Sequence, residues 1–343
     1  MENIASNELV QRISGLLNDA RHRIVQSVNH TMVLTYFEIG RMIVEEEQNG
    51  NVRADYGTQL LKTLSTKLTI DFGKGFSKRN LEQMRQFYLV YSKAQTVSAL
   101  FENHQEAPVT FQLTWSHYLK LMRIDDNSER RFYEIESVKN NWSLRELNRQ
   151  YDSALFTRLS LTRDRGQVLR LSKEGQLLEK PEDIIKDPYI LEFIGLHDKA
   201  SYSESELEQK LIEKLEHFIL ELGTGFTFVA RQDRISFDDK HFRIDLVFYN
   251  RILKCFVLID LKIGELKHQD IGQMQMYVNY YDRKVRLPDE NKTIGIILCQ
   301  NKSEAVVEFT LPENNQQIFA SKYMTVLPSK ESLIRLIKFS PKN

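Results

Sequence analysis

The spacing of apolar residues changes partway along this chain of 343 residues. Over residues 1–160, apolar side chains recur every three or four positions, as at Leu9, Ile13 and Leu16, which is the period of amphipathic helices. From Ser201 onwards, short apolar runs of strand length alternate with helical segments. The change predicts an α+β protein of two domains, the first all-helical and the second α/β.

The composition supports two folded domains. The chain is 41% hydrophobic and 27% charged with only 14 glycines and 7 prolines, which excludes collagen-like and low-complexity architectures and disfavours disorder. Its 47 basic residues equal its 47 acidic residues. A uniformly basic surface is thereby excluded, so an anionic partner would be held by local patches.

Cysteine usage and hydropathy indicate a compartment. Cys255 and Cys299 both lie in apolar runs, which predicts buried free thiols in a reducing environment. Two cysteines cannot build a disulfide framework or a cysteine zinc site. No apolar run approaches the roughly 18 residues needed to span a bilayer. We therefore expect a cytoplasmic protein without a membrane partner.

The helical half contains one segment suited to nucleic acid. Asp71–Phe76 carries two glycines that interrupt the helical period, and Ser77 can cap the helix that follows. That helix carries four basic residues, Lys78, Arg79, Arg85 and Lys93, against one acid. The aromatic residues Phe87, Tyr88 and Tyr91 are interleaved with them, as expected of a helix lying on a phosphate backbone. The alternative is a solvated basic face over an aromatic core.

The domain boundary is predicted from a change in amino-acid composition. Residues 161–200 are charged and include Gly166, Gly175, Pro181 and Pro188, which is typical of a connector. We expect a helical domain at 1–160 and a second domain at 201–343. The second domain is predicted to contain a helix ending at Gly223, strands at Phe226–Phe237, Phe242–Tyr249 and Cys255–Leu261, a helix at His268–Asp282 and a strand at Thr293–Cys299.

Two of the predicted strands carry charges among apolar neighbours. Asp245 lies in one, and Asp260 and Lys262 lie in the next. Because side chains alternate along a strand, Asp260 and Lys262 project from the same face. Burial of such ions without partners costs several kcal/mol each, so they either neutralise one another or hold a ligand. A structural ion pair that fixes strand pairing is the alternative to a site.

A divalent cation is the natural ligand for such a group. Carboxylate oxygens bind Mg²⁺ or Mn²⁺, which neutralises a phosphate and lowers the pKa of bound water, and a lysine can orient that water. Asp245 and Asp260 fit the first role, and Lys262 fits the second. A third carboxylate is expected from the preceding helix, either Glu208, which we favour because it lies within the regular helix, or Glu204.

The order of these residues resembles a known signature. Asp245, a spacer of fourteen residues and then Asp260-Leu-Lys262 is similar to the motif of PD-(D/E)xK nucleases. Gln273 and Tyr277, four residues apart on one helical face, resemble the Q-x-x-x-Y element of several branches of that superfamily. The resemblance implies that both side chains lie near the metal and the nucleic-acid backbone.

A narrower resemblance covers nearly the whole chain. Several runs are similar to the YhcG-type PD-(D/E)xK nucleases of bacteria, namely Tyr56-Gly57, Gly75–Leu81, Leu113–Tyr118, Glu221–Gln232, Phe242–Tyr249, Cys255–Lys262 and Ile294–Cys299. The family implies a helical DNA-binding domain of winged-helix or related type and a restriction-endonuclease-like nuclease domain. Ile244 replaces the proline of the motif, and Asp260 stands where glutamate is frequent. Neither difference removes a charge.

We therefore expect a Mg²⁺- or Mn²⁺-dependent endonuclease that hydrolyses phosphodiester bonds of DNA and docks through its helical domain. The alternative is a catalytically silent module that binds nucleic acid or protein on a nuclease-like fold. A third hypothesis makes the helical half a protein-interaction or dimerisation surface. The choice between DNA and RNA, the sequence specificity, the oligomeric state and the biological pathway stay open at this level.

Overall fold

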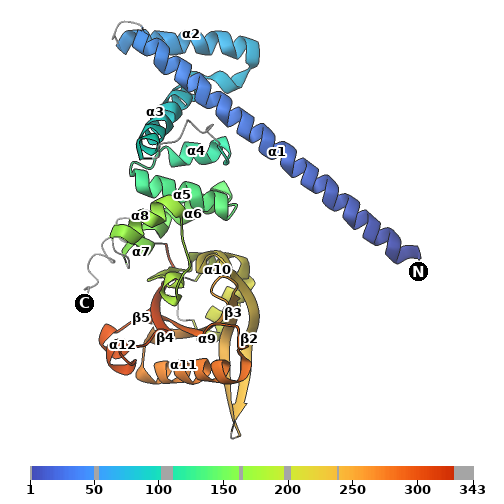
Figure 1. Ribbon diagram of the computed structural model, residues 1–343, viewed down its shortest axis with the longest axis vertical. Helices are drawn as coiled ribbons and strands as arrows, with labels where there is room; N and C mark the ends of the chain where they lie inside the picture. Colours follow the sequence, from blue (N-terminus) through green and yellow to red (C-terminus); the bar gives the residue numbers. More distant parts are fainter. Residues whose placement is uncertain are drawn as a thin grey trace. The chain divides into compact units, whose positions relative to one another are not determined.

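The computed structural model describes residues 2–49, 54–101, 111–161, 165–196, 202–237 and 239–327 (Figure 1). Its contacts divide the chain into two units, Met1–Asn148 and Arg149–Asn343. In the described part of the chain, no helix is both long enough and apolar enough to cross a membrane. The two units are treated separately below.

The regular elements among the described residues of the first unit are all helices, which confirms the helical half predicted from the sequence. Its helices are α1 (Glu2–Asn49), α2 (Ala54–Phe72), α3 (Lys78–Phe101), α4 (Trp115–Leu121) and α5 (Asn127–Lys139), with a 3₁₀ turn η1 (Lys74–Phe76) and the start of α6 (Leu144–Asp152). The described residues of this unit include no strand. The winged-helix detail therefore stays a prediction.

Helices α1 and α3 pack closely in this unit. A Cβ at Gly40 of α1 would lie 2.1 Å from the backbone oxygen of Met84 in α3, so only glycine permits this approach. Ser77 caps α3 as expected, since its Oγ accepts from the Asn80 amide at 3.4 Å. Phe87 is fully buried in an aromatic cluster. At least this aromatic residue of α3 therefore belongs to the core, as the alternative in the sequence analysis proposed.

The second unit is the predicted α/β domain, extended at its start. The segment 161–200, which we predicted to be a connector, contributes several elements to it. The unit contains α7 (Leu155–Leu161), α8 (Arg165–Glu174), η2 (Pro181–Ile184), β1 (Tyr189–Ile190), η3 (Glu192–Ile194), α9 (Glu204–Glu213), α10 (Leu215–Leu222), β2 (Phe226–Phe237), β3 (Lys240–Asn250), β4 (Cys255–Glu265), α11 (His268–Tyr280), η4 (Tyr281–Val285), β5 (Ile294–Asn301), α12 (Glu304–Thr310) and β6 (Ile318–Met324). The functional division of the chain into domains stays a prediction.

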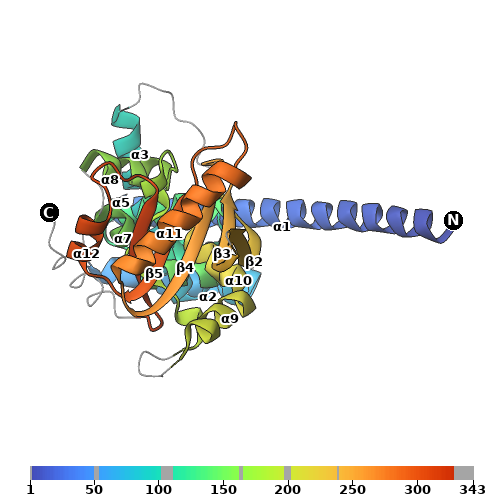
Figure 2. The same ribbon diagram turned by 90° about the horizontal axis from the view of Figure 1, so that it is seen from below.

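One six-stranded sheet in the order β1-β6-β5-β4-β3-β2 forms the centre of this unit. Strands β1, β6, β5 and β4 run parallel, whereas β2, β3 and β4 pair antiparallel. On β4, Val257 and Ile259 pack with α9 and α10, and Leu258 packs with α11 on the other face. Figure 2 shows α11 lying across the strands. By alternation, Asp260 and Lys262 belong to the α11 side.

A buried ion network joins the first segments of the second unit to α10. The Glu221 carboxylate is fully buried and accepts from Arg158 at 2.8 Å, Arg149 at 3.2 Å and the Ile190 amide at 3.0 Å. Lys186 donates to the Glu221 carbonyl. Burial alone would raise the pKa of Glu221, but the three cations lower it to about 2. The residue is therefore ionised and paired.

Both cysteines are buried and free, as predicted. Cys255 begins β4 and Cys299 lies in β5. Burial raises the pKa of Cys255 to about 12 and that of Cys299 to about 11, so both thiols stay protonated at neutral pH.

Candidate active site

Two carboxylates meet where β3 and β4 separate. The β3–β4 ladder runs up to the pair Leu246 and Ile259, and Asp245 and Asp260 each lie one residue beyond it. Instead of continuing the ladder, Asp245 accepts a hydrogen bond from the Leu261 amide through Oδ2 at 2.8 Å. Because strand pairing ends here, side chains rather than backbone groups occupy the space between the two strands.

Asp260 and Lys262 form an ion pair on one face of β4, as the alternation predicted. Asp260 is 1% exposed, and its Oδ2 lies 2.9 Å from Lys262 Nζ. This contact is an ion pair without the geometry of a hydrogen bond. Within the described residues, the buried Oδ2 atom has no hydrogen-bond partner. A buried oxygen in this state can accept a further ligand.

The electrostatics of the three residues favour an additional positive charge. Burial and, to a lesser extent, the nearby Asp245 carboxylate raise the pKa of Asp260 to about 7 against the opposing effect of Lys262. Burial alone would lower the pKa of Lys262, but the Asp260 carboxylate outweighs it and raises the value to about 12. One lysine therefore does not compensate two neighbouring carboxylates, and a cation or a proton must.

Gln232 is a member of the site that the sequence analysis missed. Its Nε2 donates to Glu208 Oε2 at 2.6 Å and to Asp245 Oδ1 at 3.0 Å, so one amide holds two acids together. Its backbone has a φ of 49°, in the left-handed region. This conformation interrupts strand alternation, which explains why the sequence pattern gave no signal for it.

Both candidate acids of the preceding helix reach this region. Glu208 is 4% exposed, accepts from Arg231 at 2.7 Å and is linked to Asp245 through Gln232. Glu204 is more exposed, and its carboxylate accepts from the Ile263 amide at 3.1 Å and lies 3.8 Å from Lys262 Nζ. The choice of Glu208 as the third carboxylate stays a prediction.

Gln273 and Tyr277 connect α11 to β3. Gln273 donates to the Tyr277 hydroxyl, which in turn donates to the Arg243 carbonyl at 2.8 Å. Burial raises the pKa of Tyr277, and the charge of Asp260 raises it further. The pair therefore lies close enough to the carboxylates to feel their charge. Its hydrogen bonds, however, join the two side chains to each other and to the backbone of β3. Its catalytic role stays a prediction, and its contacts are those of a positioning pair.

The donor set fits Mg²⁺ or Mn²⁺. Asp245 and Asp260 offer hard oxygen ligands, and the Oδ2 atom of Asp260 has an ion-pair partner in Lys262 but no hydrogen bond. Within the described ranges, no group of three or more His, Cys, Asp or Glu side chains is arranged to hold a metal ion alone. Mg²⁺ commonly binds through one or two carboxylates, with waters and substrate phosphates completing its shell.

The three basic residues predicted to bind nucleic acid differ in their surroundings. Arg85 forms an ion pair with Glu47 of α1 at 2.6 Å, and Lys78 lies 3.5 Å from Glu82. Arg79 is exposed. Of the three, Arg79 therefore presents its charge most directly to solvent.

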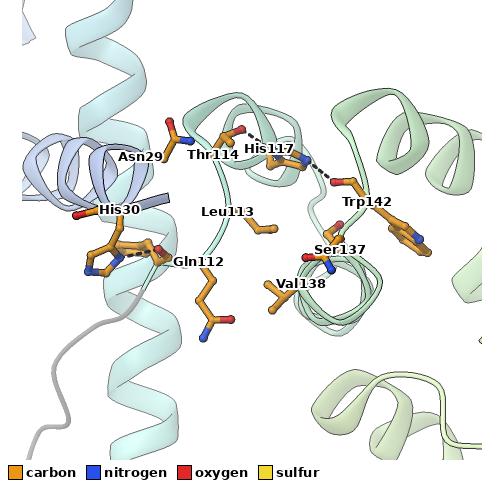
Figure 3. A pocket seen from close by; sticks show the side chains of 12 residues that line it. Asn29, His30, Gln112, Leu113, Thr114, His117, Ser137, Val138 and Trp142 are labelled. Carbon is orange, nitrogen blue, oxygen red and sulfur yellow. Dashed lines mark hydrogen bonds between the residues drawn. The ribbon is translucent and has the colours of Figure 1, made fainter. Parts of the chain in front are cut away.

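A cavity of about 660 Å³ lies in the helical unit (Figure 3). His30 hydrogen bonds with the Phe111 carbonyl at 2.8 Å, and His117 hydrogen bonds with Thr114 at 2.6 Å and the Trp142 carbonyl at 3.0 Å. The residues that line it include no Asp, Glu, Lys or Arg. It therefore offers neither carboxylates for a metal nor cations for a phosphate.

Two family models and one related sequence match this chain over most of its length. Residues 182–336 match the YhcG PDDEXK nuclease domain, and residues 12–158 match the DUF1016 N-terminal domain. The chain is 39% identical over 338 residues to YhcG of Escherichia coli (strain K12), an alignment that covers 93% of this chain and 90% of that protein.

Similarity to solved structures is weak. A repair endonuclease from Pyrococcus abyssi matches with 17% identity and a TM-score of 0.27, over 37% of this chain and 49% of that chain. A complex of EndoMS with dsDNA matches with 15% identity and a TM-score of 0.27, over 39% and 51%. The chain spans about half the length of these proteins, and at such scores they carry no argument about the site.

Proposed function

The chain belongs to the YhcG family of PD-(D/E)xK nucleases, and from this premise we propose that it is a Mg²⁺- or Mn²⁺-dependent endonuclease acting on DNA. One observation carries the proposal above all. The carboxylates of Asp245 and Asp260 lie where β3 and β4 separate, and Lys262 pairs with Asp260 at 2.9 Å. A structural ion pair alone would not require the second carboxylate, which raises the pKa of Asp260.

Asp245 and Asp260 are the residues that would hold the metal ion. When bound, the ion supplies charge neutralisation of the phosphate and a lowered pKa of water. Glu208 belongs to the same polar group through Gln232, which keeps the acids together. Their negative charge repels a phosphate unless it is compensated, which makes the reaction depend on a divalent cation.

Lys262 performs its part as a cation. Because its pKa is raised to about 12, Nζ keeps its proton at neutral pH and cannot serve as a general base. It can donate hydrogen bonds to the attacking water or to a phosphate oxygen, and its charge opposes the negative charge that develops in the transition state. Its side chain is held by Asp260 at one side and by Glu204 at 3.8 Å.

We assign DNA docking to the helical unit through α3, where Arg79 is exposed. The two buried free thiols agree with a reducing cytoplasm, which we propose as the location. The alternative, a catalytically silent binding module, would use the Asp260–Lys262 ion pair only to fix the strands.

A cleavage panel tests the proposal. The wild type and Asp245→Asn are incubated with supercoiled plasmid, linear duplex, single-stranded DNA and RNA in Mg²⁺, Mn²⁺ or EDTA. We expect cleavage by the wild type that needs metal and is lost in Asp245→Asn, with an exposed Asp125→Asn control unchanged. Binding of nucleic acid without cleavage in either metal would favour the silent module.

A further inference from the structure

Three aromatic rings gather beside the candidate active site. Phe237 ends β2, Phe242 lies on β3 and Tyr280 ends α11. The Phe237 ring is near-parallel to both others, with centroids at 5.3 Å from Phe242 and 6.5 Å from Tyr280 and interplanar angles of 26° in each case. Phe237 nevertheless remains 37% exposed. Such a near-parallel set can be extended by a further planar ring.

Open space and positive charge adjoin these rings. A cavity of about 660 Å³ is lined by residues at the end of β2 and on α11. Figure 1 shows the β2–β3 hairpin reaching past this helix. Phe237 and Tyr280 line the cavity together with the amides of Gln275 and Asn279 and the cations Arg283 and Lys284. Both cations are exposed. The cavity thus combines an aromatic wall, hydrogen-bonding amides and positive charge.

The cavity is adjacent to the carboxylates along two elements. Phe242 precedes Asp245 by three residues on β3, a separation of about 10 Å along a strand. Tyr280 follows Tyr277 by three residues on α11, and the Tyr277 hydroxyl bonds the backbone of β3. Stacked bases rise by about 3.4 Å each, so the rings lie within roughly three nucleotides of a phosphate at the carboxylates.

We propose that this cavity is a binding subsite for an unpaired base of the nucleic-acid substrate, close to the phosphate that is cut. An aromatic face binds a base by stacking only when the neighbouring base does not already cover it, which favours single-stranded or distorted substrates over continuous duplex. Arg283 and Lys284 match the charge of the backbone, although Asp239 of the hairpin tip opposes it. The inference rests on the proposed function and adds the substrate class.

Fluorescence of a base analogue tests the subsite separately from catalysis. Full-length protein carrying Lys262→Ala is titrated in Mg²⁺ into a single-stranded DNA containing 2-aminopurine and into its duplex. We expect quenching of the single strand by stacking, and a single-strand affinity that is about 5- to 30-fold weaker with Phe237→Ala, as about 1–2 kcal/mol of stacking implies. Duplex affinity should change less than about twofold. The control Phe309→Ala removes a side chain that is 84% exposed on α12 and should change nothing.

A second variant guards against a misfolded hairpin. Phe237→Trp keeps a stacking ring, so it should retain single-strand affinity and quenching, whereas Arg283→Ala should weaken binding of both DNA forms. Equal affinities for Phe237→Ala and Phe309→Ala, or no quenching with the wild-type ring, would overturn the subsite while metal-dependent cleavage still stood. Absence of both binding and cleavage in the otherwise unmodified protein would overturn the proposed function and the subsite together.

Discussion

The side-chain amide of Gln232 donates to Asp245 at 3.0 Å, and the same nitrogen reaches Glu208 at 2.6 Å. Two acids that would otherwise repel one another are thereby held by one neutral donor. Since Gln232 touches the carboxylates and no substrate atom is needed to hold it, we regard it as a positioning residue.

Replacing Gln232 by alanine should therefore weaken the site without removing a charge. We expect 10- to 100-fold lower affinity for Mg²⁺ by calorimetry and a similar loss of cleavage, as for outer partners of metal ligands generally. Gln232→Glu, which cannot donate when ionised, should be at least as harmful. The exposed Gln269→Ala on α11 is the control. Unchanged Mg²⁺ affinity in Gln232→Ala would contradict this role.

Glu221 should be essential to the stability of the second unit. Replacement by glutamine leaves the buried Arg158 without its counter-charge, so we expect a loss of about 3–5 kcal/mol in the free energy of unfolding in urea, followed by circular dichroism. Glu216→Gln, on the exposed side of the same helix, should change it by less than about 0.5 kcal/mol. Similar losses of unfolding free energy in the two variants would contradict the special role of Glu221.

The ion network around Glu221 should also make the stability of the second unit depend on acidic pH. Because the folded pKa of Glu221 is lowered to about 2, its contribution to stability is complete above an unfolded value near 4.5 and is lost as the pH falls through that window. On acidification, the free energy of unfolding of the wild type should fall towards that of Glu221→Gln. An advantage that persists at pH 2 would argue against the paired carboxylate.

Glu134 should give the helical unit the opposite pH dependence. Burial raises its pKa to about 7, against the lowering effect of Tyr118 and Arg130. A carboxylic acid with a raised folded pKa destabilises the fold as it ionises, so stability should fall between about pH 4.5 and 7 and then level off. Tryptophan fluorescence reports this unit, since Trp115 and Trp142 are the protein's two tryptophans.

Glu134→Gln should remove that slope and be more stable than the wild type at pH 8. Asp125→Asn, at an exposed position before α5, should keep the wild-type slope. Parallel pH profiles for the wild type and Glu134→Gln would show that this carboxylate is not perturbed by burial.

The two arginines of α3 should separate in a salt titration of DNA binding. Arg79→Ala should weaken binding and reduce the slope of log K against log salt by about one, as expected for the loss of one phosphate contact. Arg85→Ala should have a smaller effect on DNA, since its guanidinium is already paired with Glu47 at 2.6 Å. The reverse order would place the interface on the other side of α3.

Local periodicity predicted much of this molecule. The bounds Phe226–Phe237 match β2, and the alternation that placed Asp260 and Lys262 on one face is seen in their 2.9 Å ion pair. The bounds of a strand and the alternation along it both depend on residues that are close in the sequence. The strands β1 and β6 were not predicted, because β1 has two residues and β6 lacks regular alternation of buried positions.

Long-range contacts were beyond the sequence pattern. The bridge from Glu208 through Gln232 to Asp245 depends on a left-handed backbone at Gln232 and on where α9 lies against the sheet. The pairing of Arg85 with Glu47 joins residues 38 positions apart. Neither the periodicity of a helix nor that of a strand contains such information.

Cleavage of supercoiled plasmid in Mg²⁺ by Lys262→Ala tests the central claim most directly. Because we propose this lysine as the cation that acts in the reaction, its loss should lower the cleavage rate by about 10²- to 10⁴-fold while the far-ultraviolet circular dichroism spectrum stays that of the wild type. Lys292→Ala, at an exposed position before β5, should cleave at the wild-type rate. A wild type that cuts in Mg²⁺ and a Lys262→Ala variant that cuts equally fast would contradict the assignment of the active site.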